Sequence, residues 1–251
     1  MHWHGPISVD DTARFLSDED DRASAPKAVH VRAIGVTTPD GRATVDGTSG
    51  GLGNDVDAAL LAACRDDADV IVVGSGTVSA EGYGGHHPPP EVRAARSAAG
   101  RACVPPVAVV TRSADIAPDD HLIADAEAAP IVVTPNPGDA HDADPAREGR
   151  LAALAAAGAR ILRLPDTEPA TVRTALAEEG LPRIVLEGGP SLYREWIDAG
   201  EVDELVLTLA PIIAGSGAAT FPGGYRSHWR LHALAYGDSH VFLRYLRTTG
   251  R

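Results

Sequence analysis

Short apolar stretches alternate with helical patterns through the middle of the chain. Apolar content and length predict strands at residues 69–74, 104–112, 129–135, 160–165 and 183–189. The first three contain runs such as VIVV without a polar face, which is typical of strands that are covered on both sides. Helical periodicity predicts helices at residues 55–68, 147–159, 168–180 and 190–200. This order predicts a mostly parallel sheet between two layers of helices, joined by right-handed crossovers.

The two ends of the chain depart from this alternation. Residues 27–36, KAVHVRAIGV, predict a first strand, and after a glycine-rich loop Asn54 or Asp55 is expected to cap the first long helix. Near the C-terminus, further strands are predicted at residues 203–213, 229–237 and 240–247. No helical pattern separates the last two, so they should form an antiparallel hairpin. The fold class expected is therefore α/β with a mixed, mostly parallel sheet.

The chain is expected to hold one domain. Residues 1–26 are polar, acidic and weakly patterned, and they predict a loosely ordered N-terminal arm. Residues 27–251 predict a single domain, because no repeat, low-complexity tract or linker divides them.

Charge and cysteine content narrow the classes of function. The 22 Lys and Arg residues against 35 Asp and Glu residues give a net charge of −13, which disfavours nucleic acid or an anionic membrane as the main partner. A small anionic ligand needs only a local basic patch and stays possible. No apolar run approaches the ~20 residues of a membrane span and no leader opens the chain, so a cytoplasmic protein is expected. Cys64 and Cys103 are too few for a disulfide scaffold and are expected to be buried.

Two glycine turns carry the candidate chemistry. Gly74, Gly76 and Thr77 follow one buried strand, and Glu187, Gly188 and Gly189 follow another. In open α/β sheets ligands lie at the carboxyl ends of strands, where helix N-termini offer N–H groups to phosphate and glycine allows a close approach. Neither turn matches the dinucleotide-binding fingerprint, because the third glycine and the acidic residue of that motif are missing. Neither turn matches a P-loop, because no lysine follows it. Tight turns without a ligand remain the alternative.

A third strand end adds a positive charge. Thr111, Arg112 and Ser113 follow the strand at 104–112, and an arginine beside hydroxyls suits a phosphomonoester because its guanidinium can donate two parallel hydrogen bonds. A surface arginine is the alternative. Together the three strand ends predict a phosphorylated nucleotide cofactor.

Three motifs carry a resemblance to a known family. They are ADVIVVGSGTVSAEGYG, the stretch RIVLEGGPSLYREWIDAGEVDELVLTLAPIIAGSG, and PDGRATVDGTSG. From Val29 to Arg247 the chain resembles the reductase domain of the bifunctional riboflavin-biosynthesis deaminase/reductase, most of all the stand-alone actinobacterial members that share ATVDGTSG. The resemblance implies a dihydrofolate-reductase-like three-layer fold, NADPH as cofactor, and a homodimer.

The resemblance also implies roles for individual residues. Cofactor contacts are expected at Gly76, Thr77, Glu81, Leu164, Gly188, Gly189, Pro190, Ser191 and Leu192, and at Arg112 and Ser113 for the adenosine 2′-phosphate. Glu81 stands where relatives usually have aspartate. Glu187 is expected beside the nicotinamide, facing the substrate, and Asp40 is the second catalytic candidate. The alternatives are that Glu187 only caps the following helix and that Asp40 only forms a turn.

The implied reaction reduces the ribosylamino group of a phosphorylated aminopyrimidine to ribitylamino. Fused relatives also carry a zinc deaminase, but this chain has no C-x-x-C, so neither deamination nor a metal site is expected, including at His86 and His87. Relatives read R-A-N-x-x-S-S-L-D-G where this chain has RAIGVTTPDG, so Ile34, Thr37, Thr38 and Pro39 depart on the substrate side. Dihydrofolate or pterin reduction and a catalytically silent nucleotide-binding protein therefore remain alternatives.

Overall fold

The structure is a computed structural model of the chain and describes residues 4–17, 29–137, 144–223 and 226–248. Its strands are β1 (His4–Pro6), β2 (His30–Thr37), β3 (Val70–Gly74), β4 (Val107–Val110), β5 (Ile131–Pro135), β6 (Arg160–Leu164), β7 (Arg183–Leu186), β8 (Glu204–Leu209), β9 (Trp229–Gly237) and β10 (His240–Arg247). Its helices are α1 (Thr12–Leu16), α2 (Asp55–Asp67), α3 (Ser75–Glu81), α4 (Pro90–Ala98), α5 (His121–Ala124), α6 (Pro145–Ala156), α7 (Pro169–Glu178) and α8 (Pro190–Ala199).

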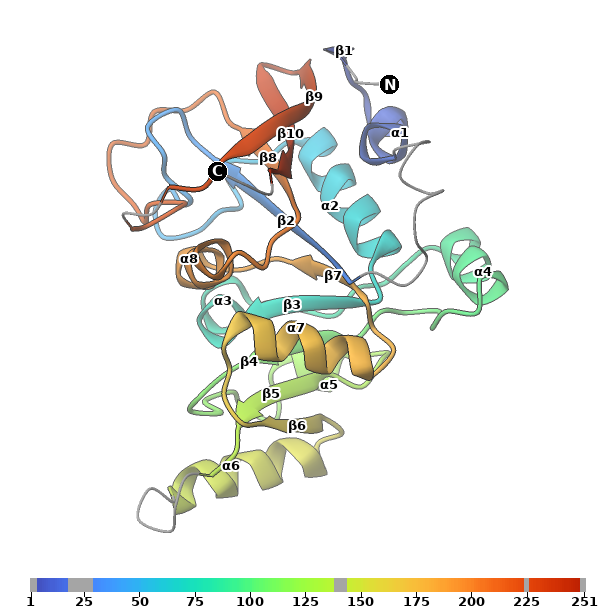
Figure 1. The fold of residues 1–251 in the computed structure, drawn as a ribbon, viewed down its shortest axis with the longest axis vertical. Coiled ribbons are helices and arrows are strands. Elements are labelled where there is room, and N and C mark those ends of the chain that lie inside the picture. The colour runs from blue at the N-terminus through green and yellow to red at the C-terminus, as the bar shows by residue number, and fades with distance from the viewer. Residues whose placement is uncertain (1–3, 18–28, 138–143, 224–225, 249–251) are drawn as a thin grey trace.

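All the strands lie in one sheet, in the order β1-β9-β10-β8-β2-β7-β3-β4-β5-β6 (Figure 1). The strands from β8 through β2 to β6 run parallel to one another, whereas β10 is antiparallel to both β8 and β9. The mixed, mostly parallel sheet with a C-terminal antiparallel hairpin is therefore confirmed. Because β7, β3 and β4 are adjacent and parallel, their carboxyl ends share one edge of the sheet.

Helices cover both faces of the sheet and make three layers. On one face Leu176 of α7 and Trp196 of α8 pack with Val72, and on the other Leu60 of α2 packs with Ile71. Successive residues of β3 thus enter opposite cores, as side chains alternate across a strand. All of these side chains are at most 1% exposed. Because both faces of β3 are buried, its sequence VIVV contains no polar residue.

The N-terminal segment differs from the loosely ordered arm that its composition predicts. Strand β1 pairs in parallel with β9, with His4 opposite Leu234, and α1 packs against α2. Phe15 is 1% exposed, and Ile7 and Leu16 are also buried in the core. These apolar side chains hold residues 4–17 on the domain. Residues 1–3 and 18–26 of the expected arm, with 27–28 of the expected domain, lie outside the described residues.

Helices α1, α3, α4 and α5 lie outside the predicted helical ranges, and one cysteine is not buried as expected. Helix α4 has little apolar surface: its buried Arg96 instead donates hydrogen bonds to the carbonyl groups of Asp66, Ala68 and Ala102. Helix α5 spans only four residues, too short to show a period. Cys64 is buried as expected, but Cys103 is exposed because it lies in the loop between α4 and β4.

Candidate active site

The two glycine turns predicted from the sequence meet at the carboxyl edge of the sheet. Figure 1 shows α3 and α8 on the left, where the arrow of β3 points. The helices follow β3 and β7, which are paired neighbours. A Cβ atom built on Gly189 would lie 3.0 Å from Thr77 Oγ1, so the turns are in contact. Gly76, in the first turn of α3, has no neighbouring atom within 4 Å of such a Cβ and faces open space.

The N-terminus of α8 is open to a ligand. Its N-cap is Gly189, which has no side chain to accept hydrogen bonds from the first turn. Pro190 has no N–H, and the N–H groups of Leu192 and Tyr193 bond to Gly189 O. Among the described residues this leaves the N–H of the exposed Ser191 without an acceptor. An open helix N-terminus of this kind favours an anion.

Packing beneath the turn fixes its position. A Cβ on Gly188 would lie 2.7 Å from Leu192, so Leu192 fills the space under the turn rather than its outer surface. Tyr193, one residue further along α8, donates a hydrogen bond to Ile34 O of β2 and accepts one from the Gly188 N–H. The turn is thus tied both to its own helix and to the central strand β2.

The arginine turn lies next along the edge. Arg112 and Ser113 are both exposed after β4, and Arg150 of α6 donates two hydrogen bonds to Ser113 O, at 3.0 and 2.7 Å. Leu164 ends β6 and is buried. Three strand spacings, about 14 Å, separate β6 from β3. The side chain of Glu81 lies outside what the structure describes.

Glu187 is paired with two residues that the sequence pattern did not single out. Its carboxylate, 7% exposed, accepts hydrogen bonds from Arg65 Nε at 2.7 Å and from Arg65 Nη2 at 2.6 Å. The hydroxyl of Tyr83 donates to Oε2 of the same carboxylate at 2.6 Å. Glu187 therefore does not cap α8, and that alternative is wrong. We call Arg65, Glu187 and Tyr83 the Arg65 cluster.

Two members of the Arg65 cluster, Arg65 and Tyr83, keep their protons near neutral pH. Burial would lower the pKa of Arg65, but its hydrogen bonds to Glu187 and the charge of that carboxylate outweigh burial and raise the pKa. Burial, followed by the charge of Glu187, raises the pKa of Tyr83 well above its ordinary value. Arg65 thus stays a cation and Tyr83 a neutral hydrogen-bond donor.

Asp40 holds two loops together. It is exposed, and its carboxylate accepts hydrogen bonds from Thr38 Oγ1 at 2.6 Å and from the N–H groups of Ala214 at 3.1 Å and Gly215 at 2.8 Å. The Thr38 hydroxyl first, and then these N–H groups, lower the pKa of Asp40 to about 2. Figure 1 shows the two loops, in blue and orange, side by side at the upper left. Near neutral pH Asp40 is therefore an anion, and it fixes the turn after β2 to the loop after β8.

Most of the first-strand residues that differ from the family's sequence pattern are buried. Ile34, Thr37 and Thr38 are 4%, 6% and 1% exposed. The Thr37 hydroxyl lies 2.7 Å from that of Thr220, so it is satisfied within the protein. Pro39 is exposed beside Asp40. Ile34 thus contributes to the core next to α2.

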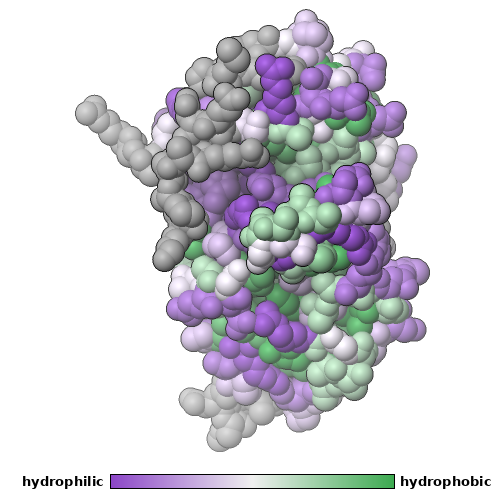
Figure 2. Space-filling model, turned by 90° about the vertical axis from the view of Figure 1, so that its right-hand side faces the viewer, coloured by the Kyte–Doolittle hydropathy of each residue, from purple (hydrophilic) through white to green (hydrophobic). Residues whose placement is uncertain are grey.

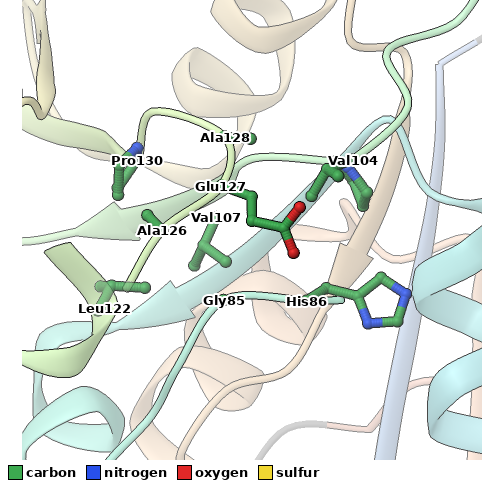
Figure 3. A pocket seen from close by; sticks show the side chains of 10 residues that line it. Gly85, His86, Val104, Val107, Leu122, Ala126, Glu127, Ala128 and Pro130 are labelled. Carbon is green, nitrogen blue, oxygen red and sulfur yellow. The ribbon is translucent and has the colours of Figure 1, made fainter. Parts of the chain in front are cut away.

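A hollow on the opposite edge of the sheet lies apart from this site. It surrounds the first residue of β4 and is lined mostly by small and apolar side chains, with His86 and Glu127 among them (Figure 3). His86 Nε2 lies 2.7 Å from Asp66, and His87 Nδ1 lies 2.5 Å from Glu127. Each histidine thus has a carboxylate partner of its own.

The comparisons with known proteins identify the family. The family model of the RibD C-terminal domain matches residues 30–241. The chain belongs to the RibD C-terminal domain family. No curated protein matches it by sequence. The family expected from the motifs is therefore confirmed.

Solved structures of RibD-like proteins share the fold. A pyrimidine reductase-like protein from Corynebacterium diphtheriae is 27% identical, with a TM-score of 0.80 over 97% of this chain and 100% of that one. The riboflavin biosynthesis reductase Rib7 of Saccharomyces cerevisiae is 17% identical, with a TM-score of 0.65 over 95% of this chain and 100% of that one.

A longer protein shares the fold over part of its length. The diaminohydroxyphosphoribosylaminopyrimidine deaminase/5-amino-6-(5-phosphoribosylamino)uracil reductase of Thermotoga maritima is 16% identical, with a TM-score of 0.67 over 88% of this chain. This chain spans 57% of that protein. At this level of identity, and at that of Rib7, the likeness shows the fold alone.

Arg65 and Tyr83 had no local signal in the sequence of this RibD-like chain. Arg65 stands in CRDDA near the end of a helix, where a basic residue is ordinarily explained by the helix dipole. Tyr83 stands in the glycine-rich stretch EGYGG. They are 122 and 104 positions from Glu187, and only the fold brings the three together.

Proposed function

We propose that this RibD-like protein is an NADPH-dependent reductase of 5-amino-6-(5-phosphoribosylamino)uracil, acting in the cytoplasm. The observation that carries the proposal is the contact between the two glycine turns at the carboxyl edge, in a member of a family of reductases. The names of the structural relatives, a pyrimidine reductase-like protein and a riboflavin biosynthesis reductase, support the substrate class. The family and the fold indicate that the chain is an oxidoreductase. What we propose beyond this is the identity of the substrate and NADPH as the cofactor.

The residues at the edge fit a dinucleotide. The open N-terminus of α8, with Gly188, Gly189, Pro190, Ser191 and Leu192, would hold the diphosphate, and Gly76, Thr77 and Glu81 would hold adjacent groups. A side chain on Gly189 would fill the space beside Thr77, which supports a close approach of the ligand there. Arg112 and Ser113, exposed after β4, would bind the adenosine 2′-phosphate, with Leu164 further along the edge.

The protein's part in the reaction is placement and electrostatics. NADPH, when bound, would supply the hydride for reduction at C1′ of the imine that forms when the ribosyl ring opens, and the imine nitrogen would take a proton from solvent. The Arg65 cluster would sit at the nicotinamide end, as the family resemblance implies for Glu187, the residue that directly precedes the glycine turn. Asp40 would act by keeping the two substrate-side loops together, since its low pKa makes it a poor proton donor near neutral pH.

One assay separates the candidate functions. NADPH oxidation would be followed with the ribosylaminopyrimidine phosphate and with dihydrofolate, side by side. Turnover of the first alone supports the proposal, and turnover of dihydrofolate alone shows a pterin reductase. Binding of NADPH without turnover of either substrate would show a catalytically inactive, nucleotide-binding homologue. The departures of the first strand from the family pattern are the reason for considering this outcome.

We also propose a homodimer formed through the C-terminal strands. One face of β8, β10 and β9 carries two rows of apolar side chains that are aligned by the strand register: Leu207, Leu243, Leu234, Leu209, Val241 and Tyr236. Tyr236 is 54% exposed. The face shown in Figure 2, which is the right-hand side of the view in Figure 1, has hydrophilic and apolar side chains mixed over its surface. A monomeric mass by light scattering at micromolar concentration would rule the dimer out.

A further inference from the structure

Two arginines at the end of β4 keep hydrogen-bond donors that the protein does not use. Arg112 is exposed and makes no hydrogen bond or ion pair with any residue that the structure describes. Arg150 of α6, whose side chain is 37% exposed, donates from Nε and Nη2 to Ser113 O, at 3.0 and 2.7 Å. Its Nη1 has no partner in the described part of the chain and is not buried. Because a guanidinium carries five N–H groups, both side chains can donate to a ligand.

Carboxylates leave this pair of arginines largely uncompensated. The ion pair of Arg150 with Asp144 is 3.6 Å long, measured from Nη2, which is beyond the distance of a hydrogen bond. Arg160 at the other end of the sheet, by comparison, lies 2.5 Å from Glu179. In a protein with a net charge of −13, two neighbouring arginines without a bonded carboxylate leave positive charge for a bound anion.

The turn after β4 holds the two arginines next to each other. Since both bonds of Arg150 go to the carbonyl group of the residue that follows Arg112, its guanidinium is fixed to the same turn. The turn itself is held by the Ala114 N–H, which donates to Thr111 Oγ1 at 3.0 Å. A donor that is fixed in advance loses little side-chain entropy when it binds a ligand.

A third arginine adds positive charge at the neighbouring strand. Arg147, one turn before Arg150 on α6, is 9% exposed, and its Nη2 donates to Pro135 O at the end of β5. Its ion pair with Glu148 is 3.9 Å long. Because β5 pairs with β4, this buried cation makes the potential at both strand ends more positive.

From this geometry we propose that Arg150 is a specificity-determining residue that binds a phosphomonoester together with Arg112. Nη1 of Arg150 and the guanidinium of Arg112 both donate to the phosphate oxygens, with the charge-assisted bonds that arginine forms to phosphate. The phosphomonoester is the 2′-phosphate of NADPH, so this inference rests on the proposed function for the identity of the cofactor. Helix α6 begins on the same, left-hand side of Figure 1 as α3 and α8, and β4 is the direct neighbour of β3.

The experiment compares ligands that differ by one phosphate and requires no turnover. Calorimetry would give the affinities for NADP⁺ and NAD⁺, and for adenosine 2′,5′-bisphosphate and adenosine 5′-phosphate, and melting would give Tm. The variants are Arg150→Gln, Arg150→Lys, Arg112→Ala and the double variant Arg112→Ala/Arg150→Gln. Arg160→Gln is the matched control, because Arg160 is a partly exposed arginine at the start of β6, on the opposite edge of the sheet.

Arg150→Gln should weaken binding of the two ligands with a 2′-phosphate by about tenfold or more, as loss of a charged donor does, and leave the other two within about twofold. Arg150→Lys should keep part of the affinity, because lysine retains the charge but lacks the fork. Since both arginines bind one phosphate, the double variant should lose less than the product of the two single losses. Arg160→Gln should change none of the affinities. Equal losses for NADP⁺ and NAD⁺ in Arg150→Gln would show that Arg150 only holds the Ser113 turn, and would overturn the proposal, as would unchanged affinity for both.

Two further arms separate the source of the phosphate and the two proposals. Binding of the ribosylaminopyrimidine with and without its phosphate tests the substrate: a loss in Arg150→Gln confined to the phosphorylated substrate would overturn the assignment to NADPH. Wild-type protein that prefers NADP⁺ through Arg150 but reduces no pyrimidine would reject the proposed reductase and leave the assignment of Arg150 in place. Reduction of the pyrimidine with equal use of NADPH and NADH would reject Arg150 and keep the reductase, and no binding of either dinucleotide would reject both.

Discussion

Arg65 and Glu187 meet side on, with Nε and Nη2 of the arginine 2.7 and 2.6 Å from the two carboxylate oxygens. Helix α2 supplies the arginine and the end of β7 supplies the carboxylate, so the pair links the helix layer to the ligand edge. Removing one partner of such a buried pair leaves the other without its counter-charge, which costs more than the net contribution of the intact pair.

Glu187→Gln should therefore lower the stability of the protein. Glutamine keeps the shape and can still accept one hydrogen bond, so we expect the free energy of unfolding to fall by about 1–3 kcal/mol. Chemical denaturation would measure it. Glu195→Gln, at an exposed position of the nearby α8, is the matched control and should change little. Unchanged stability in Glu187→Gln would mean that the pair does not form in solution.

Much of the fold was predictable because the hydrophobic pattern is local. The bounds of β9 and β10 match the predicted strands residue for residue, and Asn54 caps α2 by accepting a hydrogen bond from the Asp57 N–H at 3.0 Å. Helix α4 was missed because its buried face is formed by hydrogen bonds of Arg96 rather than by apolar residues. Periodicity cannot report such packing.

The site was predictable only where it follows from strand order. The glycine turns come directly after buried strands, and parallel neighbours place such turns on one edge. The partner of Glu187 depends instead on how α2 crosses the sheet, which no short window of sequence contains. Asp40 was correctly placed in a turn, but its hydrogen bonds to Ala214 and Gly215 join segments that are 174 and 175 positions apart.

Asp40 should make stability depend on pH in the acid range. Its pKa is about 2 in the folded protein against 3.8 ordinarily, so the folded state binds its proton less tightly than the unfolded state. The stabilisation is complete above about pH 4 and is lost as the pH falls towards 2. In Asp40→Asn this part of the pH dependence should disappear. Melting temperatures of wild type and variant between pH 2 and 6 would show it, and curves that stay parallel throughout would contradict it.

Arg112 should set the preference for NADPH over NADH. It is exposed beside Ser113 at the carboxyl end of β4, where a 2′-phosphate would lie in the proposed complex. Arg112→Ala should weaken NADPH binding by about 1.5–3 kcal/mol, or roughly ten- to hundredfold, and leave NADH nearly unchanged. Fluorescence titration with both cofactors tests this, with Arg160→Ala as the control for a surface arginine. Equal losses for the two cofactors would show that Arg112 does not bind the 2′-phosphate.

Gly76 and Gly189 should show whether the touching turns hold the cofactor. Gly189→Val places a Cβ 3.0 Å from Thr77 Oγ1 and a branch beyond it, in the space proposed for the diphosphate. We expect it to abolish detectable NADPH binding while the protein stays folded, because the turn lies at the edge of the sheet. Circular dichroism and cofactor titration would measure the two effects.

Gly76→Ala separates a steric effect on the ligand from one on the protein. No protein atom lies within 4 Å of the added Cβ, so the variant has no internal clash. Alanine should even stabilise this helical position, by about 0.5–1 kcal/mol. A weaker NADPH affinity with an unchanged or higher Tm would therefore place the ligand against Gly76. Gly188→Ala should do the opposite, since its Cβ would come 2.7 Å from Leu192 and lower Tm first. If Gly76→Ala bound NADPH as tightly as wild type, the cofactor would not pass over the β3 turn, and the proposed site would be wrong.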